Sequence, residues 1–328
     1  MPPDATNGAT QRSASTGAPN RPVISLPKGG GAISDIGEKF DVNSVTGTAS
    51  FSIPIPTSPS RSDFYPKLSL AYDSGSGNGP FGLGWSLSVP AITRKTDKGL
   101  PRYRDAEDSG IFILSGSEDL VPVLVQSGTS WSKEIYGATQ SGQAYDVELY
   151  RPRVEGLFAQ IERWMNQATA EIHWRSISKD NVTSVYGQSA SARISDPGDG
   201  SRVFTWLLEQ SYDDKGNQVL YEYKQEDATG VDTAAAEEVN RLATSTGFAN
   251  CYLKRIYYGN TGAGLPGGFS FEVVFDYGEH DPISPTPDEA QPWPVRVDPF
   301  STFRSCFIAV QISGLTAGRS GERRPVRG

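Results

Sequence analysis

The sequence predicts a mainly β protein, built as an antiparallel sheet of meanders and hairpins with at most one or two short helices. Gly (35) and Pro (23) are abundant among the 328 residues, and both residue types interrupt helices and mark turns. The 14 Tyr, 14 Phe and 6 Trp supply flat, bulky side chains that strand faces bury well. Although only 37% of the residues are hydrophobic, the chain is long enough to bury a sizeable core.

The composition divides the chain into a tail, one domain and a second tail. Residues 1–22 are rich in Ala, Ser, Thr, Asn and Pro and predict a disordered segment, because they bury too little apolar surface to offset ordering. Short apolar runs separated by turn residues begin at Val23, and we expect one β domain over residues 23–310. Residues 311–328 end in "AGRSGERRPVRG", which predicts a basic tail that is disordered or a truncated end.

Charge and hydropathy exclude two kinds of partner. The formal charge of −8 disfavours nucleic acid, because its binding needs a basic face that displaces counterions from phosphates. No window approaches the roughly 18 apolar residues of a membrane helix, so we expect no direct membrane insertion. The first twenty residues lack the apolar run of a signal peptide, which predicts a cytoplasmic protein or one secreted to the extracellular space by another route.

The first half of the domain shows three alternating stretches. Apolar residues alternate with Ser or Pro over residues 51–56, and Pro54 favours an edge strand because proline cannot donate to a ladder. Residues 68–72 alternate in the same way and predict a second strand. The stretch "GWSLSVPAI", from residue 84 to 92, predicts a third.

The second half predicts a meander, a hairpin and two further strands. The meander is predicted from "GLFAQIERW", "EIHWRSIS" and "VTSVYG". Residues 202–224 predict the hairpin, with "DDKGN" as an exposed turn. Its inward faces are predicted to be Phe204, Trp206 and Leu208 on one strand and Val219, Tyr221 and Tyr223 on the other. "YLKRIYYG" and "FSFEVVFDYG" predict the two strands, and only residues 232–243 predict a helix, with Asp232 or Thr233 as its N-cap.

The stretch "GSGNGPFGLGWSLSVP" contains a G-x-G-x-x-G match at Gly77, Gly79 and Gly82. A dinucleotide site needs a helix directly after these glycines, because the helix N-terminus holds the pyrophosphate. Here the next residues continue with the period of a strand, and Pro80 lies inside the motif. We therefore predict tight turns between strands and no cofactor.

The same stretch carries a specific family resemblance. The run "ISLPKGGGAISDIGEKF" and the run "VTGTASFSIPIPTSPSRSDFYPKLSLAYDSGSGNGPFGLGWSLSVPAITRKTDKGLPRY" resemble the opening of the SpvB-like family, the Salmonella virulence plasmid B-protein domain. That domain also begins the B component of insecticidal Tc toxin complexes. The resemblance continues through "HWRSISKDNVTSVYG", "FTWLLEQSYDDKGNQVLYEYK", "CYLKRIYYGN" and "VRVDPFSTFRSCF", and covers roughly residues 23–307.

The resemblance implies a structural role. "SYDDKGNQVLYEY" is similar to the tyrosine–aspartate repeat of RHS proteins, whose strands form a hollow shell around a toxin. On this resemblance we expect a non-enzymatic structural component of a virulence factor or insecticidal toxin complex, whose sheet forms part of an RHS-like β shell that holds or delivers a toxin. Its implied partners are an RHS-repeat C-type component and a pore-forming A-type component. The alternative is a free-standing extracellular module that binds carbohydrate or a host surface protein.

Enzymatic chemistry is not predicted for this chain. Some family members carry an ADP-ribosyltransferase domain, whose chemistry needs a Glu-x-Glu pair, and none of the 17 glutamates here stands two positions from another. His173 and His280 are the only histidines and show no metal-ligand spacing, so we expect His173 to be a structural strand residue. We assign no catalytic, cofactor-binding or metal-binding residue.

Three further groups of residues have a structural and a functional interpretation. Asp residues stand near glycine at 105–110, 195–200 and 213–217, a pattern that calcium loops share but that local turns favour. Cys251 and Cys306 are too few for a disulfide framework; one bridge stays open, and two free thiols are favoured. Three tryptophans could stack on sugars but are favoured as core residues, namely Trp164, Trp174 and Trp206.

Overall fold

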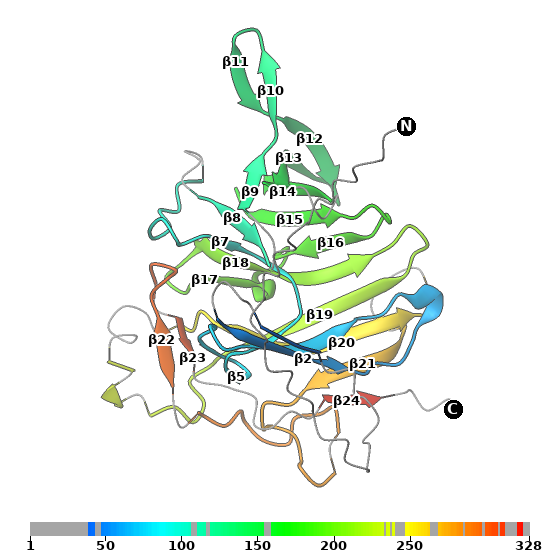
Figure 1. The fold of residues 1–328 in the computed structure, drawn as a ribbon, viewed down its shortest axis with the longest axis vertical. Coiled ribbons are helices and arrows are strands. Elements are labelled where there is room, and N and C mark those ends of the chain that lie inside the picture. The colour runs from blue at the N-terminus through cyan, green and yellow to red at the C-terminus, as the bar shows by residue number, and fades with distance from the viewer. Residues whose placement is uncertain are drawn as a thin grey trace, which may run out of the picture. The chain divides into compact units, whose positions relative to one another are not determined.

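The structure is a computed structural model. It describes residues 39–42, 47–105, 110–115, 119–153, 159–232, 234–236, 238–239, 247–262, 268–284, 286–296, 299–307, 309–311 and 320–323. Within these residues the secondary structure is almost entirely strand, arranged in antiparallel sheets (Figure 1). The predicted mainly β class is confirmed. Among the described residues no helix has the length and apolar character needed to cross a bilayer.

Part of the largest sheet is closed on itself. In pairing order the closed part contains β16 (Thr183–Tyr186), β15 (Ile172–Ile177), β14 (Gln160–Asn166), β13 (Gln143–Pro152), β9 (Asp119–Pro122), β8 (Phe112–Leu114), β7 (Ala91–Arg94) and β18 (Asp199–Tyr212). β18 also pairs with β16, which completes the ring. A ring of about eight strands leaves an interior that side chains can just fill.

β18 closes the ring because it is 14 residues long and its two halves pair with different strands. Its first half pairs with β17 (Arg193–Asp196), and the centre pairs with β7. Its second half pairs with β16 and with β19 (Gln218–Gln225). A register shift between Val185 and Tyr186 marks an irregularity where β16 meets β18, and such bulges bend a strand.

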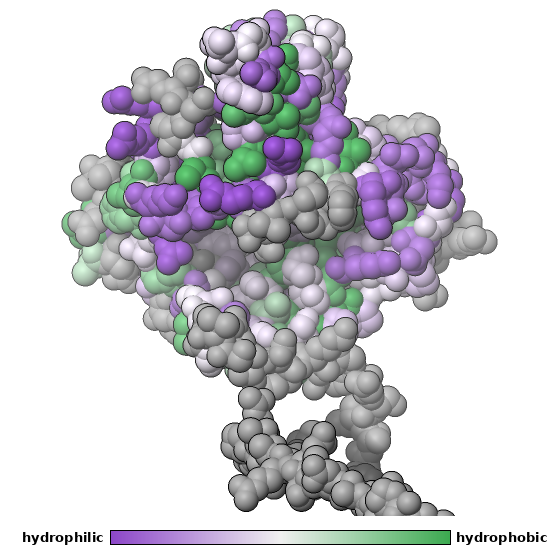
Figure 2. Space-filling view, turned by 45° about the horizontal axis from the view of Figure 1, so that its top comes forward, coloured by the Kyte–Doolittle hydropathy of each residue, from purple (hydrophilic) through white to green (hydrophobic). Residues whose placement is uncertain are grey.

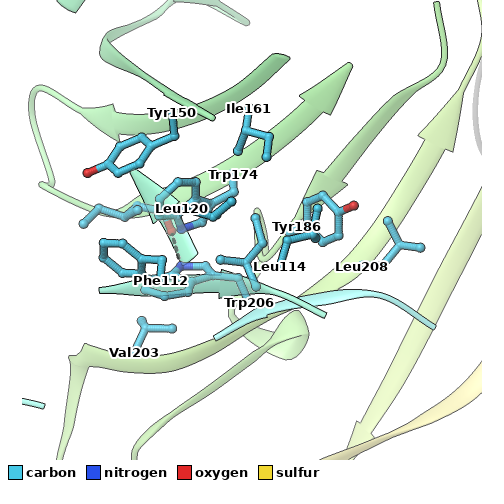
Figure 3. Close-up of a cluster of buried hydrophobic side chains, with 12 residues drawn as sticks. Phe112, Leu114, Leu120, Tyr150, Ile161, Trp174, Tyr186, Val203, Trp206 and Leu208 are labelled. Atoms are coloured by element: carbon cyan, nitrogen blue, oxygen red, sulfur yellow. Dashed lines mark hydrogen bonds between the residues drawn. The ribbon is translucent and has the colours of Figure 1, made fainter. Parts of the chain in front are cut away.

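Side chains from all eight strands of the ring fill its interior (Figure 3). They are Ile92, Phe112, Leu114, Leu120, Tyr150, Ile161, Ile172, Trp174, Tyr186, Val203, Trp206 and Leu208. Trp174 and Trp206 are fully buried and meet edge to face, with ring centroids 6.0 Å apart. Phe112 lies 4.8 Å from Trp174 and 5.8 Å from Trp206, measured between ring centroids. This aromatic cluster is the main core.

Beyond β18 the sheet continues as an open wing. It contains β19, β20 (Cys251–Asn260), β21 (Phe269–Phe275) and β24 (Ser320–Arg323). A separate sheet is formed by β1 (Lys39–Val42), β2 (Ala49–Ile55), β3 (Leu68–Asp73) and β6 (Trp85–Leu87). Leu68 of β3 joins Ile256, Tyr258 and Val273 of the wing in a second core cluster. Burial of this apolar surface holds the two sheets together.

Short strands and turns complete the fold. β10 (Leu124–Ser127) and β11 (Ser130–Lys133) form a hairpin that projects from the top of Figure 1, and β12 (Ile135–Gln140) pairs with β13. β4 (Asn78–Gly79) pairs with β5 (Gly82–Leu83), and β22 (Phe300–Thr302) pairs with β23 (Ala309–Gln311). Two single 3-10 turns, η1 (Arg61–Asp63) and η3 (Ala190–Ala192), lie in the loops of the described ranges.

Most predicted strands are confirmed, with three differences of detail. The meander is β14–β15–β16, and the hairpin is β18–β19, but Phe204 packs in a separate cluster and not with Trp206 and Leu208 as predicted. The strand predicted over residues 84–92 is two strands, because β6 ends at Leu87 and β7 begins in a different sheet after Pro90. β2 is an edge strand only around Pro54, since β1 pairs with its first four residues.

The predicted turn and helix are partly described. Asp214, Lys215 and Gly216 are exposed at the tip of the β18–β19 hairpin, but Asn217 is buried and accepts a 2.8 Å hydrogen bond from Arg61 Nε. The prediction of a fully exposed turn is therefore wrong at Asn217. In the predicted helix 232–243, the described residues Ala236, Glu238 and Val239 are helical, and most of the remainder lies outside the described residues.

The predicted division into tails and domain stays a prediction. Residues 1–22 lie outside the described residues. Within the predicted basic tail, residues 320–323 form β24, which pairs with residues 272–275 of β21. That segment of the tail is therefore a strand of the wing.

Candidate functional site

The glycine-rich stretch is a series of tight turns between strands. β4 and β5 form a minimal hairpin around Pro80 and Phe81, and β6 comes directly after it as a strand. Gly82 and Gly84 have φ of 99° and 81°, a region that residues with a side chain rarely adopt. A Cβ at Gly84 would also lie 2.6 Å from the Tyr72 ring. The prediction of turns is confirmed, and no strand-to-helix junction comes after these glycines in the described part of the chain.

The three tryptophans that are favoured as core residues over sugar-stacking residues lie in the core. Trp174 and Trp206 have no exposed surface, and Trp164 is 7% exposed. Trp164 packs against Tyr145 with ring centroids 5.4 Å apart. A sugar could stack on none of these three indoles without unfolding the sheet, so the core interpretation is confirmed and the carbohydrate interpretation has lost its sequence support.

His173 is a neutral core residue. Its ring on β15 lies between Tyr145 and Trp164, with centroids at 5.5 and 5.6 Å. Burial and the positive charges of Arg175 and Arg193 lower the pKa of His173 to about 3. Its Nε2 has no hydrogen-bond partner among the described residues. The expectation of a structural role agrees with this position.

His280 belongs to a buried ionic cluster that the sequence did not predict. Lys254 Nζ contacts a carboxylate oxygen of Glu279 and lies 2.7 Å from His280 Nε2 and 3.0 Å from the Phe275 carbonyl oxygen. The Nδ1 of His280 lies 3.0 Å from the carbonyl oxygen of Asp288, so Nδ1 is the donor and Nε2 accepts from the ammonium.

The same cluster resembles a metal-ligand set. One ligand atom from each of Asp276, Glu279 and His280 lies within 4.8 Å of the others, which a divalent cation could bridge. The Lys254 ammonium, however, already makes contacts with two of these residues. The Lys254 ammonium thus takes the place that a metal cation would have. Its contacts with Glu279 and His280 hold the loop after β21 against β20.

The aspartates near glycine make the local bonds expected of turns. Asp213 Oδ1 accepts hydrogen bonds from the backbone N–H groups of Lys215 and Asn217, at 2.9 and 2.8 Å. Asp199 Oδ1 likewise accepts from the backbone and hydroxyl of Ser201. These contacts fit the turn interpretation. In the third group, residues 106–109 lie outside the described residues.

Both cysteines are free thiols. Cys251 is buried, and its desolvation, together with the nearby Glu226 charge, raises its pKa to about 12. Cys306 is partly exposed, with its Sγ 3.3 Å from the carbonyl oxygen of Pro101. A thiol with a raised pKa is a poor nucleophile, so Cys251 is a structural residue.

A cavity of about 520 Å³ borders the core of the closed sheet, because the core residues Ile172, Val203 and Trp206 form part of its lining. Its lining comes from β11, β12, β13, β14, β15, β17 and β18, from the turn before β15 and from the loop that contains Tyr103 and Asp105. Glu148 Oε2 on β13 accepts hydrogen bonds from Arg163 Nη1 at 2.9 Å and Lys133 Nζ at 3.2 Å. Asp105, also in the lining, accepts two 2.7 Å hydrogen bonds from Arg94. Both of these carboxylates in the lining are therefore held by cations.

The second unusual surface is the projecting hairpin β10–β11 with the start of β12. Large apolar side chains are exposed there, namely Leu124, Val125, Trp131, Ile135 and Tyr136. Trp131 is 62% exposed, in contrast to the buried tryptophans of the core. Figure 2, in which the top of the molecule is turned forward, shows hydrophobic surface between hydrophilic patches in its upper part. Contiguous exposed apolar surface marks sites of association.

Sequence reasoning missed both the cavity and the hairpin. The signal for the cavity was a charged residue at a core-facing position within an apolar strand, as at Glu148 and Arg163, which are cross-strand partners. The signal for the hairpin was an apolar segment, residues 120–125, with Trp131 after it in a short polar turn region. The sequence did not assign either feature to a site, because pairing between strands decides which residues meet.

The closed sheet with its antiparallel wing defines a β domain of a kind found in bacterial virulence and toxin proteins. The family model of the Salmonella virulence plasmid 65kDa B protein, SpvB, matches residues 43–312. The chain belongs to this family. The predicted family membership is confirmed.

Curated relatives agree with this assignment. Mono(ADP-ribosyl)transferase SpvB of Salmonella choleraesuis (strain SC-B67) is 35% identical over an alignment of 299 residues, which covers 86% of this chain and 48% of the relative. The protein of the same name from Salmonella typhimurium matches at 35% over 298 residues, with the same coverage. The chain spans about half the length of the curated relatives it matches.

Solved structures show the same fold in two settings. The N-terminal domain of effector protein SpvB from Salmonella typhimurium strain LT2 matches with a TM-score of 0.71 and 32% identity, covering 80% of this chain and 84% of that one. A chain of TcdB2-TccC3 matches with a TM-score of 0.74 and 33% identity, covering 89% of this chain and 14% of that one. A chain of the Photorhabdus luminescens Tc holotoxin pore matches with a TM-score of 0.74 and 32% identity, and it covers the same shares of the two chains.

The comparisons correct the predicted function. The expectations of a non-enzymatic structural component and of no enzyme are wrong, because the curated relatives are named as mono(ADP-ribosyl)transferases. The reason is the difference in length between this chain and its relatives. The search for a Glu-x-Glu pair tested only the residues of this chain, whereas the relatives are about twice as long as the aligned part.

Proposed function

We propose that this chain acts in a mono(ADP-ribosyl)transferase effector or toxin of the SpvB type, and that its β domain binds partner subunits. The observation that carries the proposal is that one fold, at TM-scores of 0.71 and 0.74, belongs to an effector protein and to a chain of TcdB2-TccC3. A domain used in both settings is suited to joining a toxin activity to other proteins.

The hairpin β10–β11 supports a binding role. Its strands are exposed along their whole length except at Lys133, and the pair forms a sheet of its own. Two-stranded hairpins are marginally stable alone, and unpaired strand edges favour association with another chain. The partners proposed are an RHS-repeat subunit of the C type and a pore-forming subunit of the A type. We place the action of the assembly outside the producing cell.

Co-purification with a transferase assay tests the proposal. The full chain is tagged, co-expressed with the RHS-repeat subunit encoded nearest to it, and purified under mild conditions. The eluate is then incubated with biotin-labelled NAD and a eukaryotic cell lysate. We expect a stable complex and transfer of the label to a lysate protein. An eluate that contains no toxin subunit and transfers no label contradicts the proposal.

A surface variant identifies the binding face. The double change Leu124→Ser and Trp131→Ser removes the apolar surface of the hairpin, and we expect the complex to weaken at least tenfold. The matched control is Ile283→Ser, because Ile283 is 93% exposed on a different part of the surface. Equal loss of the complex in both variants would exclude the hairpin as the binding face.

A further inference from the structure

The cavity at the core of the closed sheet has the size and the mixed apolar and charged lining of a ligand site. Its volume of about 520 Å³ lies within the range of small-molecule pockets, roughly 300–1,000 Å³. Ile135, Met165 and Val203 contribute apolar surface, while Lys133 and Arg163 contribute charge. A pocket of this kind orients a ligand that has a charged group and an apolar body.

The ionic balance at the cavity favours an anion. Each of the carboxylates Asp105 and Glu148 is already bound by a cation. Glu171, a third carboxylate of the lining, is 61% exposed and only 3.6 Å from Arg193 Nη1. The lining and its ion-pair partners thus hold four cations against three carboxylates, which are Arg94, Lys133, Arg163 and Arg193 against Asp105, Glu148 and Glu171. The excess is one positive charge.

Arg163 is the cation with unused hydrogen-bonding capacity. The residue is 2% exposed, and its Nε has no hydrogen-bond partner among the described residues. Buried donors without an acceptor are rare, because each costs roughly 1–3 kcal/mol. Arg163 Nη1 donates to Glu148. The Nε edge of the guanidinium is therefore the part that can donate to a ligand, and this edge can bind two oxygens of one carboxylate or phosphate.

We propose that this cavity is a binding site for a small organic oxyanion, a carboxylate or a phosphate ester, whose charged group binds Arg163 and Lys133. The apolar body of the ligand lies against Met165 and Val203. Binding requires the Arg163 side chain to turn so that its buried Nε edge faces the cavity; the oxyanion then completes the hydrogen bonds of the guanidinium and neutralises the excess charge of the lining.

The backbone and the electrostatics around the cavity support this assignment. Tyr103 and Ala170, both in the lining, have φ of 54° and 59°, and such strained non-glycine residues concentrate at functional sites. Burial alone would raise the pKa of Asp105, but the hydrogen bonds from Arg94 and the nearby charge of Arg163 keep it below its usual value. The attraction of these cations for the Asp105 carboxylate therefore outweighs the effect of its burial on the pKa.

Isothermal titration calorimetry on the full chain tests the site with three ring compounds of similar size. Benzoate and phenyl phosphate carry the two kinds of oxyanion, and benzamide is their uncharged counterpart. We expect saturable binding of at least one anion at one site per chain, and binding of benzamide at least tenfold weaker. Binding of benzoate alone assigns the site to carboxylates, and binding of phenyl phosphate alone assigns it to phosphate esters.

Variants locate the binding. Lys133→Gln removes a partly exposed charge of the lining and should weaken the anion at least tenfold. Lys224→Gln is the matched control, because Lys224 forms a partly exposed ion pair with Glu289 on the wing. Arg163→Lys keeps the positive charge but lacks the forked guanidinium. Provided that its melting curve shows a folded protein, we expect this variant also to bind the anion at least tenfold more weakly. Absence of saturable anion binding, equal binding of benzamide, or unchanged affinity in Lys133→Gln overturns the proposal.

Discussion

The indole Nε1 of Trp206 on β18 donates a 2.8 Å hydrogen bond to the carbonyl oxygen of Ile172 on β15 (Figure 3). These two strands are not paired with each other, since β16 lies between them in the ring. The bond therefore crosses the interior of the closed sheet and satisfies the one polar atom of a fully buried side chain. Trp206 thus connects two walls of the core.

Truncation of Trp206 should destabilise the protein strongly. Trp206→Ala leaves a cavity among Phe112, Trp174 and Leu208 and removes the bond to Ile172, at a cost of about 3–5 kcal/mol in the free energy of unfolding. Thermal unfolding measures the effect. Asp214→Ala, at the exposed tip of the same hairpin, is the control and should change the melting temperature little. A Trp206→Ala protein as stable as its parent would contradict the core assignment.

Gly187 should tolerate no side chain. Its φ is 63°, and a Cβ there would lie 2.5 Å from Trp206 Cδ1. We expect Gly187→Ala to combine about 1–2 kcal/mol of backbone cost with about 1–3 kcal/mol of overpacking. Gly216→Ala is a matched control, because Gly216 has φ of 77° and no atom within 4 Å of its added Cβ. Urea unfolding of both variants separates the steric contribution, and equal losses would exclude a clash with Trp206.

His173 should make the protein less stable in acid. The folded protein keeps the imidazole neutral down to its pKa of about 3, whereas the unfolded chain binds a proton near pH 6.5. Stability from this residue is complete above pH 6.5 and is lost as the pH falls below that value, by about 2 kcal/mol between pH 7 and 5.

The acid effect is measured by urea unfolding at pH 7, 6 and 5. The comparison protein is His173→Phe, which keeps a ring between Tyr145 and Trp164 but cannot bind a proton. We expect the parent to lose about 2 kcal/mol more than His173→Phe over this range. Identical pH dependence of the two proteins would show that His173 titrates normally in the folded state.

The Lys254–Glu279 pair should show strong coupling. Glu279→Gln removes the carboxylate from a buried ammonium and should cost about 3–5 kcal/mol in the free energy of unfolding. Replacing both charges, with Lys254→Met and Glu279→Gln together, should recover part of that loss because no unpaired charge remains. With Lys254→Met alone as the third variant, chemical unfolding of the three variants and the parent gives the coupling energy. A double variant less stable than Glu279→Gln would contradict this account.

The sequence by itself determined the fold class, most strands and the family. Alternation of apolar residues marked β2, β3, β14, β15, β18, β19, β20 and β21, because a strand with one buried face must show period two. The glycine-rich turns were also predictable, because Gly82 and Gly84 take up backbone conformations that other residues avoid. These are local properties, and local sequence carries them.

Only the tertiary structure decided how the strands close and which polar groups meet. The break between β6 and β7 at Pro90, the pairing of β16 with β18 and the burial of Asn217 each depend on a partner distant in sequence. The charged cavity arises in the same way, because Arg94, Asp105, Lys133 and Arg163 lie on separate segments. Their encounter is set by strand register and ring closure, which no periodicity within one segment encodes.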